Sequence, residues 1–144
     1  MRLGMRRKRG RVAVRPGYAP REVDAVGDVR NEPAGERVEV VVMSGEHDLG
    51  TVSQVRDALG AAAGDGKAVL VDLSSATFVD SSILGALLEA RREAQEGDRG
   101  FAVACSGEAE PVRRVLEVTG LAEELPVYPT REAALAALDA QGSP

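Results

Sequence analysis

The sequence is poor in aromatic side chains, with two Phe, two Tyr and no Trp among 144 residues. It also contains a single cysteine, Cys105, and a single histidine, His47. A lone cysteine excludes an intramolecular disulfide and favours a reducing, cytoplasmic location. The length fits one domain and suffices for a core without disulfides or metals. We therefore expect one domain with a core of Val, Leu and Ala.

Several functional signatures are missing as well. No stretch approaches the roughly 18–20 apolar residues that a membrane span requires, and no signal-peptide run follows the N-terminal charges. The phosphate-binding patterns G-x-x-x-x-G-K-[ST] and G-x-G-x-x-G are absent, so we expect no nucleotide cofactor. One His and one Cys without clustered acidic ligands indicate that there is no metal site.

The charge is unevenly distributed along the chain. Residues 1–21 contain eight Arg or Lys and no acidic residue, whereas residues 22–144 carry ten basic and 23 acidic side chains, a balance of −13. An acidic body argues against direct nucleic-acid binding. A basic arm is compatible with a tether to nucleic acid or membrane. We favour a flexible leader, because the arm lacks aromatics and helical periodicity.

The remaining pattern alternates strands with helices. Arg, Pro and Gly dominate residues 1–35, where we expect the arm and a short strand around Asp24–Arg30. Runs typical of strands occupy residues 37–43, 67–73, 99–105 and 125–128, the last at a sheet edge because of Pro126. Helices are expected after Thr51, after Asp80, over residues 107–119 and after Thr130, with residues 74–79 as a loop and 141–144 as a frayed tail.

This alternation predicts an α/β domain over residues 36–140. Its single sheet should be mostly parallel, with about four or five strands and about four helices. In such sheets, functional residues gather in the loops beyond the carboxyl ends of the strands. The candidate loops are therefore residues 44–51, 74–82 and 105–110.

Two of these loops carry unusually polar sequences, Gly45-Glu46-His47-Asp48 and Asp80-Ser81-Ser82. If their strands are neighbours, Asp48 approaches the two serines. Asp80 is a preferred N-cap, which places the serine hydroxyls in the first helical turn, where the helix favours an anion such as phosphate. Simple helix capping explains the same residues, so both interpretations remain open at this point.

A serine hydrolase is the enzymatic alternative, with Ser82, His47 and Asp48 as a triad. Adjacent His and Asp side chains rarely converge on one point, and the G-x-S-x-G elbow is absent. We therefore expect no enzyme, an exposed His47 in a loop, and Cys105 as a small buried hydrophobe.

The runs Gly45-Glu46-His47-Asp48-Leu49 and Asp80-Ser81-Ser82-Ile83-Leu84-Gly85 resemble the STAS domain in its anti-sigma factor antagonist branch, with usual runs G-E-L-D-L and D-S-S/T-G-L-G. The resemblance covers about residues 36–139. It implies a non-catalytic protein that binds an anti-sigma factor serine kinase and so releases a sigma factor. The kinase would phosphorylate Ser82, in preference to Ser81, and a serine phosphatase would reset the switch.

The partner-binding residues that the resemblance implies are Asp48, Asp80, Ser81, Ser82 and Ile83. Ile83 departs from the family pattern, which has Gly there, and a β-branched side chain crowds the hydroxyl. Ile83 therefore either contacts the partner or makes Ser82 a poorer substrate. Two alternatives remain: a STAS subunit of a lipid-transport ATPase complex that is never phosphorylated, and a module that senses nucleotides or small ligands.

Overall fold

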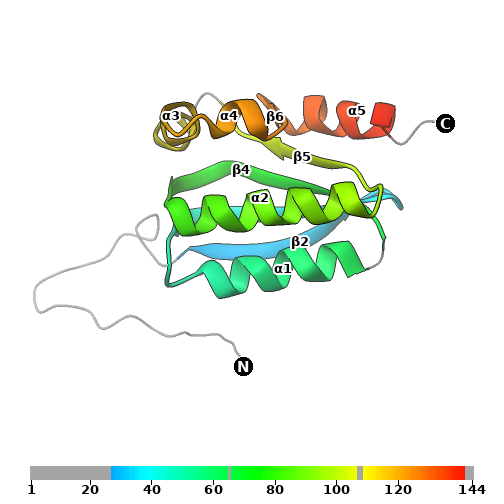
Figure 1. The fold of residues 1–144 in the computed structure, drawn as a ribbon, viewed down its shortest axis with the longest axis horizontal. Helices are drawn as coiled ribbons and strands as arrows, with labels where there is room; N and C mark the ends of the chain where they lie inside the picture. The colour runs from blue at the N-terminus through cyan, green and yellow to red at the C-terminus, as the bar shows by residue number, and fades with distance from the viewer. Residues whose placement is uncertain (1–26, 65, 107–108, 142–144) are drawn as a thin grey trace, which may run out of the picture.

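A computed structural model of the chain describes residues 27–64, 66–106 and 109–141 (Figure 1). One five-stranded sheet is flanked by helices. The strands are β2 (Asp28–Ala34), β3 (Val38–His47), β4 (Ala68–Val79), β5 (Phe101–Ala104) and β6 (Val127–Tyr128). The helices are α1 (Val52–Gly64), α2 (Ser81–Glu96), α3 (Glu110–Val118), α4 (Leu121–Glu124) and α5 (Arg131–Gln141).

The strand order is β2-β3-β4-β5-β6, so β6 lies at an edge as its proline predicts. The β2–β3 pair is antiparallel, and the other three pairs are parallel. Each parallel pair needs a crossover connection, and α1, α2 and α3 supply these. The expectation of a mostly parallel α/β sheet is confirmed.

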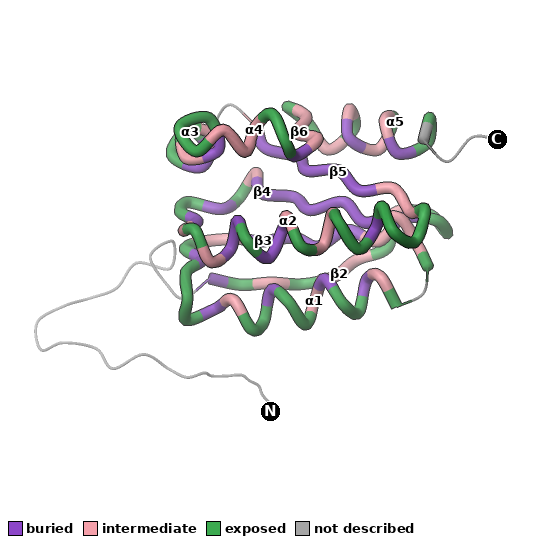
Figure 2. The backbone as a smooth tube through the Cα atoms, in the orientation of Figure 1, coloured by how far each residue is buried: buried purple, intermediate pink, exposed green. Residues whose placement is uncertain are grey.

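Two apolar clusters cover the two faces of the sheet. Val69, Val71 and Leu73 of β4 pack in the cluster formed with α1, α2 and α3, whereas Leu70 packs in the cluster formed with α5. This alternation follows from the period of two along a strand. Figure 2 shows that β4 and β5 are buried along most of their length, as strands covered on both faces must be.

The N-terminal boundary differs from the expected one. A short strand was expected within the arm around Asp24–Arg30. Residues 28–34 form β2, and every residue of β2 pairs with β3, whereas residues 24–26 lie outside the described part of the chain. The sheet therefore includes residues that precede the expected boundary at residue 36. The basic residues 1–21 and the tail residues 142–144 lie outside the described part of the chain.

Residues 74–79 were expected to be a loop, and this expectation is wrong. They continue β4, and the pairing with β3 extends to His47 and Val79 through two register shifts. β-Bulges insert extra residues and break the two-residue alternation that identifies a strand. The short helix α4 was also missed.

A partly buried ion-pair cluster fixes the start of α5 to the sheet. The Arg131 Nε donates a hydrogen bond to Asp72 Oδ2 at 3.0 Å, and its Nη1 donates to Glu32 Oε2 at 2.8 Å. The hydrogen bond from Arg131 lowers the pKa of Glu32, and the same bond raises the pKa of Arg131. Asp72 is only 8% exposed, so Arg131 compensates a charge that water cannot reach well.

We predict that Arg131→Ala lowers the free energy of unfolding by about 1–3 kcal/mol, because it leaves the Asp72 carboxylate buried without its partner. Arg114→Ala is the matched control, since Arg114 is exposed and 4.0 Å from Glu110. This control should change stability by less than about 0.5 kcal/mol. Urea denaturation followed by circular dichroism measures both, and equal losses would contradict a specific role for the cluster.

Candidate functional site

The two polar runs meet at the carboxyl ends of β3 and β4. These strands are neighbours in the sheet, and their last paired residues are His47 and Val79. The backbone N–H of Asp80 donates to the carbonyl of His47 at 3.2 Å. The backbone N–H of Leu49 donates to Asp80 Oδ2 at 3.1 Å. Leu49 and Asp80, 31 residues apart in the chain, thus belong to one surface, as the parallel arrangement predicted.

The Asp80 carboxylate organises this surface. Its Oδ1 accepts hydrogen bonds from the backbone N–H of Ser82 at 2.9 Å and of Ile83 at 3.2 Å, which makes Asp80 the N-cap of α2. The same oxygen accepts from the Ser82 hydroxyl at 2.6 Å. The other carboxylate oxygen, Oδ2, accepts the hydrogen bond from the backbone N–H of Leu49. One side chain therefore starts the helix, orients a serine and fixes the neighbouring loop.

The pKa of Asp80 is lowered by this arrangement. Desolvation by burial acts to raise it and is the largest single influence. The hydrogen bonds from the Ser82 hydroxyl and from the backbone of Ile83, Ser82 and Leu49 together outweigh that effect. Donors that point at the charged form stabilise the carboxylate. Asp80 is consequently a fixed negative charge at the helix start.

The other predicted site residues differ in their exposure and in their hydrogen bonds. Ser81 is exposed, whereas Ser82 is partly buried because its hydroxyl turns toward Asp80. Asp48 is exposed, and its Oδ1 accepts from the backbone N–H of Gly50 at 2.8 Å. Asp48 therefore shapes its own turn, which is joined to Asp80 through the backbone of Leu49.

The sequence left two roles open for Ile83, a contact with the partner or crowding that makes Ser82 a poorer substrate, and the burial of its side chain argues against the first. Its side chain is fully buried in the cluster between the sheet and the helices. The helical turn that exposes Ser81 directs Ile83 inward, so Ile83 supports the site from beneath.

His47 was expected to be an exposed loop residue, and it is fully buried instead. Its ring lies within hydrogen-bond distance of Thr51 Oγ1 and the Ser44 carbonyl oxygen. A Ser82–His47 catalytic pair is therefore not formed. Cys105 is buried as expected, and burial raises the pKa of its thiol.

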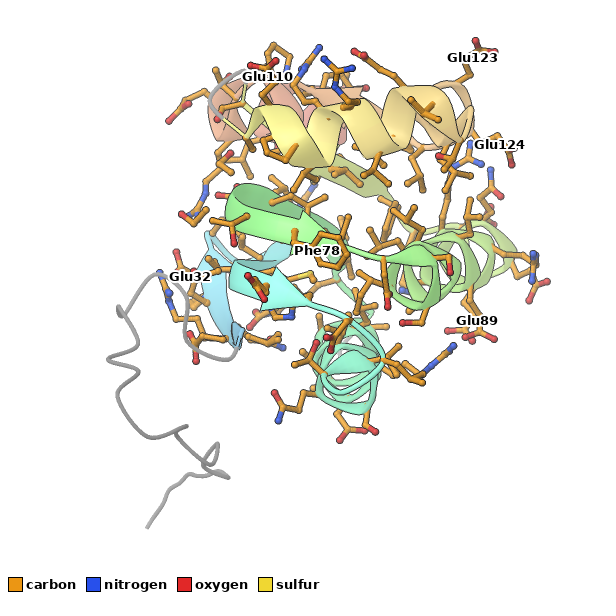
Figure 3. The ribbon with its side chains drawn as sticks, turned by 90° about the vertical axis from the view of Figure 1, so that its left-hand side faces the viewer. Glu32, Phe78, Glu89, Glu110, Glu123 and Glu124 are labelled. Carbon is orange, nitrogen blue, oxygen red and sulfur yellow. The ribbon has the colours of Figure 1, made fainter. Side chains whose placement is uncertain are left out.

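Two exposed apolar residues at this end of the sheet were not identified from the sequence. Leu49 is 74% exposed and Phe78 is 44% exposed, and each belongs to one of the two segments. Figure 3 shows Phe78 projecting from the end of β4. Leu49 follows the first polar run and Phe78 lies two residues before Asp80. An apolar side chain beside a polar loop is itself a signal of a contact surface.

Other classes of site are not indicated by the described residues. No group of three His, Cys, Asp or Glu side chains there is arranged to hold a metal ion. None of the helices in the same ranges combines the length and apolar character needed to cross a bilayer.

We predict that Asp80→Ala destabilises the protein by about 1–2 kcal/mol, the usual cost of losing a helix N-cap. Asp80→Asn should cost less at neutral pH, because an amide oxygen still caps. A lowered carboxyl pKa contributes stability above the unfolded pKa, about 3.9, which is lost as pH falls through the folded pKa. Wild type and Asp80→Asn should therefore converge in acid.

Denaturation curves at several pH values test this expectation. Asp57→Ala, at an exposed position of α1, is the control and should stay within about 0.5 kcal/mol of wild type. A difference between wild type and Asp80→Asn that persists unchanged into acid would argue against the charged cap.

Comparison with known proteins gives a consistent assignment. The sequence matches the STAS domain family over residues 33–134. It has no significant match among curated proteins. An anti-sigma factor antagonist from Mycobacterium paratuberculosis is 34% identical, with a TM-score of 0.70 over 79% of this chain and 95% of that one.

The antagonist SpoIIAA provides two further similar structures. Its unphosphorylated form is 22% identical, with a TM-score of 0.65 over 78% of this chain and 97% of that one. The phosphorylated form of SpoIIAA, described as a Bacillus cell fate determinant, has a TM-score of 0.58 at 22% identity over 76% and 98% of the chains. At 22% identity, the similarity to SpoIIAA supports the assignment of the fold alone. From the family match and the 34% identical antagonist, we conclude that this chain belongs to the STAS domain family.

Proposed function

We propose that this protein is an anti-sigma factor antagonist whose binding to an anti-sigma factor serine kinase is switched off by phosphorylation of Ser82. The observation that carries the proposal is the Ser82 hydroxyl, which the Asp80 carboxylate holds at the accessible start of α2. The similarity to the mycobacterial antagonist supports the regulatory role. The existence of SpoIIAA in phosphorylated and unphosphorylated forms supports the choice of switch.

Phosphorylation would change the site in a specific way. A phosphorylated Ser82 oxygen has no proton to donate, so the 2.6 Å hydrogen bond to Asp80 would be lost. The phosphate would place about −1.5 to −2 charges beside an acid that is already ionised. Asp80 also holds the backbone of Leu49, so the repulsion would reach the β3–α1 loop.

The surface around Ser82 is suited to a protein partner in its unmodified form. Leu49 and Phe78 offer exposed apolar area, and Asp48 and Ser81 add polar groups. A partner that covers this surface would have to bury the phosphate of a modified Ser82 without matching cations. A penalty of about 4 kcal/mol would lower affinity nearly a thousandfold, which is sufficient for a switch.

The first test is phosphate transfer. Incubation with the partner kinase and ATP should add one phosphate to the intact mass of wild type and of Ser81→Ala, and none to Ser82→Ala. Ser82→Ala should still bind the kinase, and Ser82→Asp should bind at least tenfold more weakly. Equal binding by wild type and Ser82→Asp would contradict the switch.

The second test concerns the apolar part of the surface. We predict that Leu49→Ser weakens kinase binding about tenfold, because interface apolar contacts of this size contribute about 1–2 kcal/mol. Val118→Ser is the matched control. Val118 is also an exposed apolar residue, at 78%, but it lies at the end of α3 and not in either of the two segments that form the site. Calorimetric titration compares the two. If both variants lose affinity equally, the surface around Leu49 is not the contact.

A further inference from the structure

His47 is a buried titratable side chain to which the proposed function assigns no role. Its Nε2 lies 2.9 Å from the Ser44 carbonyl oxygen, and its Nδ1 lies 3.0 Å from Thr51 Oγ1. A carbonyl oxygen only accepts hydrogen bonds, so Nε2 carries a proton in both the neutral and the charged ring. Gain of a proton from solvent therefore changes Nδ1, the atom that faces Thr51.

The hydrogen bonds around Thr51 are compatible with both the neutral and the charged form of the His47 ring. With a neutral ring, the Thr51 hydroxyl donates to Nδ1. With a charged ring, Nδ1–H donates to Thr51 Oγ1, and the hydroxyl proton turns to the carbonyl oxygen of Asp48, 3.2 Å away. Protonation of His47 thus changes which hydrogen bonds the Thr51 hydroxyl makes in the turn that begins at Asp48.

The ring is tightly enclosed, so it cannot simply swing out when it becomes charged. A Cβ on Gly27 would lie 2.6 Å from the ring atoms Cε1 and Nε2. Thr51, on the α1 side, is 4% exposed. The response to protonation is therefore a rearrangement of the bonds around the ring.

The charged groups near the ring are acidic. Asp28 of β2 and Asp48 of the loop favour the cation, and Glu46 precedes His47 in the chain. The backbone N–H of Asp80 donates to the backbone carbonyl oxygen of His47 rather than to the ring. Thr51, the residue before α1, is uncharged. Burial opposes the cation most strongly, and the pKa of His47 is lowered from its ordinary value.

We propose that His47 is a positioning residue for Ser82. The protonation state of the His47 ring is transmitted through Thr51 and the Asp48–Gly50 turn to Asp80. The path follows contacts already described, because Leu49 in that turn donates to the carboxylate that orients Ser82. The effect on phosphorylation rests on the proposed function, whereas the coupling itself does not. His47 stands where the G-E-L-D-L run of the family has Leu, so the inference concerns a property of this chain.

Nuclear magnetic resonance of the full chain between pH 5 and 8 tests the coupling directly. His47 is the only histidine, so its ring signals are unambiguous. We expect the ring to titrate with a midpoint below about 6.5, and the backbone amides of Leu49 and Ser82 to shift with the same midpoint. His47→Leu should remove both amide responses. Thr51→Ser should keep them, and Thr51→Val should remove them while the ring still titrates.

A ring that titrates while the Leu49 and Ser82 amides stay unchanged would overturn the proposal, as would an unchanged amide response in Thr51→Val. Thr51→Val keeps the test decisive if His47→Leu fails to fold. Because the folded state binds this proton less readily than the unfolded chain, wild type should lose stability relative to His47→Leu as pH falls below about 6.5.

The consequence for the proposed function is measured separately. The rate of Ser82 phosphorylation should change at least twofold across the His47 midpoint in wild type and show no step there in His47→Leu. Absence of phosphate transfer in both proteins would count against the proposed function alone, because the resonance experiment needs no kinase.

Discussion

The candidate site depends on one carboxylate. Asp80 receives four hydrogen bonds, three on one oxygen and one on the other, and these bonds join the start of α2 to the loop after β3. A neutral side chain could cap the helix, but it would bind the donors less strongly. Because the same oxygen accepts from the helix backbone and from the Ser82 hydroxyl, helix capping and the positioning of that hydroxyl are one interaction here. The two interpretations that the sequence left open are therefore compatible.

The rest of the fold brings these groups together and keeps them in place. Parallel pairing of β3 with β4 places both strand ends at the same edge. The apolar clusters on the two faces hold the helices against the sheet, and Arg131 fixes α5 through Asp72. The fully buried Ile83 belongs to this support, because it anchors the first turn of α2 from below.

Much of this architecture could be predicted from local sequence. The β-branched runs gave the central strands, and Asp80 was recognisable as a cap because capping depends on a few neighbouring residues. The extension of β4 through Ala76 and Val79 was missed because bulges remove its periodicity. Burial of His47 could not be predicted, since its hydrogen-bond partners come from a strand end and a helix start that only the fold brings together.

The packing of Gly27 against His47 also determines where a label can be attached to the protein. Gly27, the first described residue, packs against the His47 ring, so the chain enters the domain at the end that carries Ser82. The last turn of α5 lies at the opposite end of the molecule from the start of α2 (Figure 1). A fluorophore or affinity handle joined after α5 would therefore leave the proposed partner surface open, whereas a bulky fusion joined close to Gly27 would lie next to that surface.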